Sequence, residues 1–458
     1  MFFSIFLFFS LLSQDTLTDS LHYYPTLKKI PELEVSPFRG EPYIFEVTQP
    51  YLNLDERTLS FIDISNQRNI PYPPDFNYFS FLQNIPFENT DFVGYVICPA
   101  YILQNLYITL FPSPTSLFNS NGSPAYLRLR GFNKKVPFSQ IRLFRDKAKN
   151  ENMQFTFGRN ITKYGRFNAA ADYLDESEGT KRSIGLDTEV DLPFNTSSHF
   201  IFFDIKDEKP GYPIEQKLLS FSVSRKEGII SLFQKRDDGK EYIGGASDLY
   251  LGLPYQKITV GFDFPSFDSS YYQAIFVDRI NPTPLLYIVP KLVVDAEKEH
   301  SLSLGAGYHP QVKLFVYGNV LYDKEGTIYS SIGIRTKRKK SRFESFIFWR
   351  DVLTKEGSGA ALFYNGEVSP NFYLTSLLVS RLDGENFIYL QPLYQKPFKK
   401  GKLKPGIFSG IGYNRDGMTV NTGIVIEIID VSLYFVFDDV IDSEKREYKF
   451  GVQWNFYD

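Results

Sequence analysis

The chain has 458 residues, which is long enough for two or three ordinary domains or for one large closed sheet. Its formal net charge of −3 gives no overall attraction to nucleic acid, and 22% charged residues beside 43% hydrophobic ones exclude a disordered chain. The single cysteine, Cys98, excludes an intrachain disulfide and a cysteine-based metal cluster. Aromatic residues reach 17%, with 44 Phe and 31 Tyr, and this composition favours strands.

The first residues, MFFSIFLFFSLLSQD, form an apolar stretch that is too short to cross a bilayer as a helix. Its length and the small Ser13 near its end are typical of a signal peptide, so we expect residues 1–13 to direct export. A buried N-terminal strand is the alternative interpretation. No later apolar run reaches the length of a transmembrane helix.

Residues 14–130 are irregular and punctuated by proline, as in IPYPPDFNYF, ICPAY and LFPSPTSLF. Because proline cannot donate a hydrogen bond to a sheet, long central strands are not expected here. We predict a small, loop-rich domain with a few short strands, such as YIFEVT and LYITLF.

Residues 131–458 repeat one pattern, in which strand-length runs of alternating side chains are separated by short polar turns. MQFTFGRNI places Met153 and Phe155 on one face, LSFSVS places Leu219 and Phe221, and SLSLGAGY places Leu302. The intervening positions are serine, glycine, threonine or polar. Turn signals such as DDGK, DKEG and NRDG separate about twenty such runs.

This alternation predicts an all-β fold that closes on itself in a membrane. The pattern continues without a helical interlude, its apolar face is aliphatic or aromatic, and its other face is expected to carry Gly, Ser, Thr, Asn, Gln and charge. Aromatic residues gather at the ends of the runs, as at a membrane–water boundary. A sheet in lipid must have no open edge. We therefore predict a transmembrane antiparallel β-barrel of 16–22 strands in the outer membrane, against the alternative of a secreted all-β sandwich.

The last run, EYKFGVQWNFYD, places one apolar side chain at every second position: Tyr448, Phe450, Val452, Trp454 and Phe456. It resembles the C-terminal assembly signal of bacterial outer-membrane proteins, which usually ends on Phe. The overhanging Tyr457 and Asp458 depart from that pattern. The resemblance implies a strand that closes the barrel, with outer-membrane lipid and the barrel-assembly machinery as partners.

Two N-terminal segments resemble the plug of TonB-dependent receptors. LEVSPFRGEPYIFEV is similar to the start of such a plug, and LYITLFPSPTSLFNSNGSPAYLRLRG to its end, with Pro112, Ser113 and Phe118 in register. Leu110 and Phe111 replace the Arg-Gly pair of the family. VPFSQIRLFRD resembles the first strands of plug-bearing porins. The resemblance implies that residues 14–130 plug a barrel formed by 131–458. A periplasmic extension without a gating role is the alternative.

Enzymatic chemistry is not indicated by the sequence. None of its serines lies in a nucleophile-elbow motif. We interpret the pairs Asp237–Asp238 and Asp438–Asp439 as solvated charges in or near turns. His199 and His309 flank turns and have no evident partners. We expect no enzyme, no catalytic residue, no metal and no cofactor.

The expected function therefore rests on the lumen of the barrel. The polar face carries charges of both signs that would line a water-filled passage: Arg142, Lys257, Asp263, Lys313, Arg335, Lys337, Lys449 and also Glu427. Mutual neutralisation in a filled interior is the alternative. We expect a plugged channel or transporter for small solutes. Active uptake by a TonB-dependent receptor with an inner-membrane energising partner, and a non-transporting anchor or secretion component, remain alternatives.

Overall fold

The computed structural model describes residues 45–46, 78–82, 85–87, 103–108, 123–129 and most of 137–457. Within the last range it leaves out 147–150, 163–164, 177–178, 209–213, 238, 268–270, 312, 339–340, 350, 353–357, 383–385, 399–400, 415–416, 439 and 442–446. No helix in the described part of the chain is long and apolar enough to cross a membrane.

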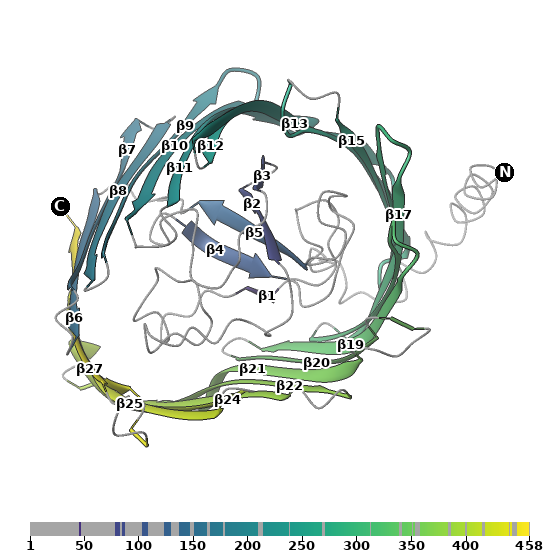
Figure 1. Cartoon of the computed structure of the whole chain (residues 1–458). Coiled ribbons are helices and arrows are strands. Elements are labelled where there is room, and N and C mark those ends of the chain that lie inside the picture. The colour runs from purple at the N-terminus through teal and green to yellow at the C-terminus, as the bar shows by residue number, and fades with distance from the viewer. Residues whose placement is uncertain are drawn as a thin grey trace.

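Strands β6 to β27 form one closed barrel of 22 strands, which Figure 1 shows as an unbroken ring. Each strand pairs antiparallel with the next one in the chain, and β27 pairs with β6 to close the ring. The fold predicted from the alternating pattern is thus confirmed, at the upper end of the expected number of strands. The barrel strands are β6 (Phe138–Asp146), β7 (Glu151–Thr162), β8 (Gly165–Glu176), β9 (Gly179–Leu192), β10 (Thr196–Asp207), β11 (Ile214–Arg225), β12 (Gly228–Asp237), β13 (Lys240–Leu253), β14 (Gln256–Phe264), β15 (Gln273–Thr283), β16 (Leu286–Asp295), β17 (His300–Gln311), β18 (Leu314–Tyr322), β19 (Ile328–Arg338), β20 (Ser341–Trp349), β21 (Gly359–Ser369), β22 (Phe372–Arg381), β23 (Asn386–Gln395), β24 (Leu403–Asn414), β25 (Gly417–Ile428), β26 (Val431–Asp438) and β27 (Glu447–Tyr457).

The outer face of the barrel is apolar and exposed, as a lipid-facing surface must be. Met153, Phe155 and Leu302 are 57%, 42% and 50% exposed, whereas the serines that alternate with such residues, including Ser222 and Ser301, are buried on the inner face. The period-2 assignment of the two faces follows the sequence pattern at these positions.

The inner face differs from expectation because it also carries large aromatic side chains. Tyr287, Phe203 and Phe363 are the largest fully buried side chains of the described residues. Several rings of the inner wall fit because glycine occupies a neighbouring position. A Cβ atom on Gly333, for example, would lie 2.5 Å from Cζ of Tyr317 and 2.6 Å from Cβ of Phe346. The small residues of the inner face therefore make room for aromatic rings.

The two ends of the barrel have connections of different length. At the end where β6 begins and β27 finishes, here called the base, the connections are two or three residues long except 396–402. At the opposite end, the rim, they include 208–213, 265–272, 350–358 and 439–446. Outer-membrane barrels have short periplasmic turns and longer external loops. The base is therefore the periplasmic end.

Five short strands form a second sheet in the order β1-β4-β5-β2-β3. They are β1 (Phe45–Glu46), β2 (Tyr78–Leu82), β3 (Ile85–Phe87), β4 (Leu103–Ile108) and β5 (Ser123–Leu129). In Figure 1 this sheet lies inside the outline of the ring of barrel strands. Strand β3 contacts β13 of the barrel wall. Residues 1–13, the predicted signal peptide, and Cys98 lie outside the described residues.

Candidate functional site

The inner wall of the barrel holds the buried polar groups of this protein. Strand register places opposite residues of neighbouring strands on the same face, so the inner wall can be followed from strand to strand. On β8 to β11, Arg166 is opposite Glu189, Glu189 is opposite His199, and His199 is opposite Ser222. The inner wall is thus a set of polar rows that cross several strands.

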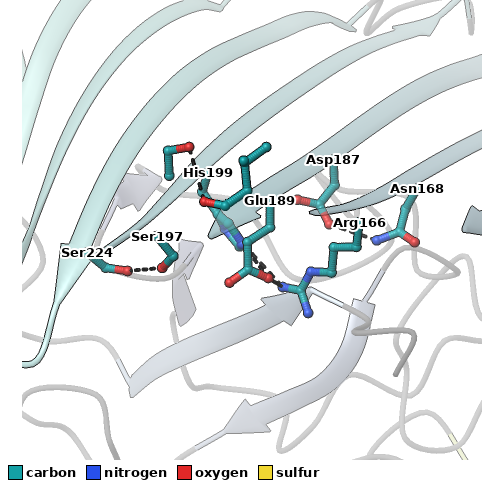
Figure 2. A network of polar contacts seen from close by, with 9 residues as sticks. Arg166, Asn168, Asp187, Glu189, Ser197, His199 and Ser224 are labelled. Atoms are coloured by element: carbon teal, nitrogen blue, oxygen red, sulfur yellow. Dashed lines mark hydrogen bonds and ion pairs between the residues drawn. The ribbon is translucent and has the colours of Figure 1, made fainter. Parts of the chain in front are cut away.

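The first of these rows is an ion-pair network near the base. Figure 2 shows Arg166 and His199 on either side of Glu189, on three successive strands. Arg166 forms an ion pair with Glu189 and lies 3.2 Å from Nε2 of His199, which is also 3.2 Å from Glu189 Oε2. The expectation that His199 has no partner is therefore wrong. Its partners lie on other strands, and only the strand register brings them next to His199.

Two further polar contacts lie on the same strands, β8 to β11. Asn168 Nδ2 donates to Asp187 Oδ2 at 2.9 Å, and both side chains are buried. The Ser197 and Ser224 hydroxyls are 2.7 Å apart on β10 and β11 (Figure 2). The carboxylate of Asp187 is thereby held on the inner wall by an amide rather than by a cation.

A second cluster lies on β17 to β20, also toward the base. Arg335 and Glu344 are opposite each other, and the hydroxyl of Tyr317 donates to Glu344 Oε1 at 2.5 Å. The guanidinium carbon of Arg335 lies 5.9 Å from the ring centres of both Phe315 and Tyr317. His309 stacks on Phe315 with 4.5 Å between ring centres, so His309 also has a partner that was not expected. This cluster combines aromatic rings with a neutralised charge pair.

A smaller network near the base involves β23, β24 and β25. Lys404 Nζ lies 3.0 Å from Glu427 Oε2, and Gln395 Nε2 donates to Glu427 Oε1 at 2.9 Å. Glu427, which the sequence also places in the lumen, is thus on the inner face opposite Lys404. Both side chains remain partly exposed, so this pair is in contact with water.

Buried carboxylates occupy the rim end of β14 to β16. Asp263 accepts a hydrogen bond of 2.7 Å from Gln273, and Asp295 accepts one of 2.8 Å from the Tyr271 hydroxyl. Burial, and next the hydrogen bond to Asp295, raise the pKa of Tyr271. In this sector the inner wall is acidic at the rim and basic at the base, where Lys257 and Arg279 are opposite each other.

The structure places the predicted lumen residues as follows. Asp263 and Arg335 are buried on the inner wall, and Lys257 is exposed on it. Lys313 lies in the turn between β17 and β18 rather than in a strand. Arg142, Lys337 and Lys449 lie in β6, β19 and β27, but their side chains are outside the described set. Their roles in a passage remain predictions. The assembly signal also remains a prediction; in that strand Tyr448, Phe450 and Trp454 are exposed and Val452 is half-buried.

Chemically, this wall can bind and guide polar solutes. In the described part of the chain, no three His, Cys, Asp or Glu side chains gather as they would around a metal ion. Charges are arranged in pairs and rows along a wide barrel, a pattern suited to holding water and charged groups. The histidine network and the aromatic cluster were missed by sequence reasoning. Hairpin spacing could have indicated the pairs Glu189–His199 and Arg335–Glu344, which lie on consecutive strands.

Comparison with known proteins gives a structural match. No family model matches the sequence, and no curated protein matches it. Among solved structures, the siderophore receptor PirA from Pseudomonas aeruginosa has a TM-score of 0.63 and 12% identity, covering 83% of this chain and 90% of that chain. PirA from Acinetobacter baumannii has a TM-score of 0.63 and 8% identity over 83% and 90%. P. aeruginosa FpvA bound to heterologous pyoverdines has a TM-score of 0.63 and 11% identity over 83% and 80%.

These identities are too low to transfer a ligand, and they show the fold. The closed ring of 22 strands, its apolar exterior and the match in size and shape agree with one another. The protein is therefore an outer-membrane β-barrel with the fold of TonB-dependent siderophore receptors.

Proposed function

We propose that this protein is an outer-membrane receptor for energised uptake of a small solute, with residues 14–130 as its plug. The observation that carries the proposal is the five-stranded sheet within the ring of a 22-stranded barrel. A barrel of this width has a lumen that stays open unless something fills it. A filled lumen requires a driven rearrangement before a solute can pass.

The likeness to PirA and FpvA favours this over the simple channel that the sequence first indicates. PirA is a siderophore receptor, and FpvA binds pyoverdines. For this chain we propose only a class of solute and not a particular one: a small polar solute enters at the rim, and an inner-membrane partner supplies the energy. Rim connections of at most nine residues, such as 350–358, leave the inner wall as the main surface for contact with the solute.

The test compares the full chain with a variant that lacks Leu33–Gly122. In planar bilayers the full chain should give little steady conductance, and the deletion variant should give large, lasting channels. In cells, entry of a polar dye through the full chain should stop when a protonophore collapses the inner-membrane gradient.

Two results would contradict the proposal. Steady conductance of the full chain, equal to that of the deletion variant, would make the protein a passive channel. Dye entry that continues after the gradient has collapsed would exclude energised uptake.

A further inference from the structure

One connection at the base of the barrel differs from the others in length and charge. Residues 396–402, between β23 and β24, form the only base connection longer than three residues. Their sequence, KPFKKGK, contains four lysines and no acidic residue. The other base connections carry at most two cations each, as in Lys339–Lys340. Positive charge is therefore concentrated at this turn on the periplasmic end.

Backbone hydrogen bonds hold the described part of the turn as a continuation of the β23–β24 hairpin. The amide of Lys396 donates to the carbonyl of Pro405 at 3.1 Å, and the amide of Phe398 donates to that of Leu403 at 2.7 Å. The amide of Gly401 donates to the Phe398 carbonyl at 2.9 Å, with a φ of +84° that glycine adopts without strain. The side chains near the turn therefore have defined faces.

The outward face of this turn continues the lipid-facing surface of the barrel. Phe398 is paired with Leu403, and Leu403 is opposite Ile428. The same row of register partners continues through Val431 to Trp454, which is 49% exposed on the outer face. Register partners share a face of a sheet. Phe398, which is 44% exposed, therefore lies on the lipid side of the hairpin.

Two exposed lysines accompany this apolar face. The Nζ atom of Lys396 lies over the ring of Phe398, 5.4 Å from its centre. Among the described residues, neither Lys396 nor Lys402 forms an ion pair, whereas the inward Lys404 is paired with Glu427. An aromatic ring and an ammonium in contact on the lipid side are typical of the membrane–water boundary, where the ring lies in the apolar layer and the ammonium reaches the headgroups.

The neighbouring turn, between β25 and β26, adds a further apolar side chain. The amide of Ile429 donates to the carbonyl of Lys402 at 3.0 Å, which ties the two turns together. The side chain of Ile429 is 70% exposed, so covering it with acyl chains would be favourable. Apolar side chains and lysines thus occur together at this part of the base.

We propose that the turn 396–402 is a binding site for an anionic phospholipid of the periplasmic leaflet. Lys396 and Lys402 contact the phosphate of the headgroup, and Phe398 lies among the first carbons of the acyl chains. Each lysine near an anionic membrane surface strengthens binding by about fivefold. The positive charge of the turn complements such a headgroup, and its continuity with the lipid-facing surface favours a lipid over a soluble partner.

The test is quenching of tryptophan fluorescence by brominated lipids. In a W349F and W454F background, F398W places the sole tryptophan in the turn and keeps a ring beneath Lys396. The full chain is reconstituted at low ionic strength into phosphatidylcholine bilayers that contain either brominated phosphatidylglycerol or brominated phosphatidylcholine. The two quenching curves give the relative affinity of this position for the two lipids, which should favour phosphatidylglycerol by about fivefold or more.

Charge variants test whether the lysines cause this preference. K396Q combined with K402Q should bring the relative affinity close to one, and about 1 M salt should weaken the preference of the parent. The matched control is K226Q, because Lys226 is also exposed in a base turn but lies 3.4 Å from Glu227. K226Q should keep the preference of the parent, and heat-modifiable mobility on gels should show that every variant is folded.

Four results would overturn the proposal. The first three are equal quenching by the two lipids in the parent, an unchanged preference after K396Q with K402Q, and an equal loss in K226Q. The fourth is the absence of quenching by either lipid, which would place the turn in water and indicate a soluble acidic partner instead. None of these measurements depends on uptake or on an energy source.

Discussion

Arg335 and Glu344 form a two-pronged ion pair across β19 and β20, with Nε to Oε2 at 2.8 Å and one terminal guanidinium nitrogen to Oε1 at 3.0 Å. Their side chains are 5% and 0% exposed. The pair is thus buried on the inner wall, and the hydroxyl of Tyr317 completes it. Removal of one partner would leave a buried charge without compensation.

Glu344→Gln is therefore expected to lower the free energy of unfolding by about 3–5 kcal/mol. The double replacement Arg335→Met with Glu344→Leu should cost less, because it removes both charges. Urea unfolding in detergent, followed by tryptophan fluorescence, measures both. Glu427→Gln is the control for a partly exposed pair and should change stability by less than about 1 kcal/mol. A cost for Glu344→Gln no larger than that of the control would contradict the prediction.

Gly307→Ala tests whether glycine on the inner wall is needed to leave space for an aromatic ring. A Cβ atom there would overlap Cζ of Tyr287 and Cε2 of Phe315. We expect a loss of about 1–3 kcal/mol from overpacking, and Gly307→Ala should cost less when it is made in a Tyr287→Ala background. Gly252→Ala is the control, because no atom lies within 4 Å of a Cβ at that position. Thermal unfolding of Gly307→Ala, Tyr287→Ala, their double variant and Gly252→Ala gives the comparison. Equal stability of Gly307→Ala and Gly252→Ala would refute the steric argument.

Asp323 in the turn after β18 should make stability depend on pH. Burial, which outweighs the hydrogen bond from the Thr327 amide, raises the pKa of this carboxyl above its ordinary value of 3.8. The folded state then holds its proton more tightly than the unfolded state. The stability should therefore fall as the pH rises from about 4 through the folded pKa, and the loss is complete above it.

Asp323→Asn keeps an oxygen that accepts from the Glu325 and Thr327 amides, but it cannot ionise. Urea titrations between pH 4 and 7 should show a smaller fall for this variant than for the wild type. The same slope in both proteins would show that Asp323 does not contribute.

Phe456→Ala should impair assembly in the membrane more than Asp458→Ala. Phe456 is opposite Ser139 in the closing pair of strands and is in phase with the exposed Trp454. Asp458 lies beyond the end of β27. The amount of heat-modifiable barrel in outer-membrane fractions measures assembly, and equal amounts for the two variants would contradict the phase assigned to the strand.

The barrel could be predicted from the sequence because the side chains of a strand alternate between two faces, and the face in contact with lipid must be apolar. Leu302 and Ser301 show this directly: one is exposed, the other is buried, and both follow from the alternation. Closure then follows because open edges are not tolerated in a bilayer. The contents of the inner wall could not be predicted in the same way, since they depend on register between strands.

Tyr317 shows why the contacts of the inner wall could not be predicted from the sequence. Its ring lies inward because Gly333 on the next strand leaves space, and only the pairing of β18 with β19 makes these two residues neighbours. Lys313 was expected in a strand, but the pairing of Gln311 with Leu314 places it in the two-residue turn between β17 and β18. Arg166 and His199 are likewise far apart in sequence, and they meet through Glu189.

The pairing of β27 with β6 also has a consequence for how the protein is made. Phe450 is opposite Arg145, so the ring cannot close before nearly the whole chain has been synthesised. Until then the sheet has two free edges, which attract any other strand nearby. Contacts between such distant parts of a chain form slowly. A cell that produces this protein must therefore shield each copy from its neighbours between synthesis and insertion, and expression faster than that shielding should yield aggregates built through these edges.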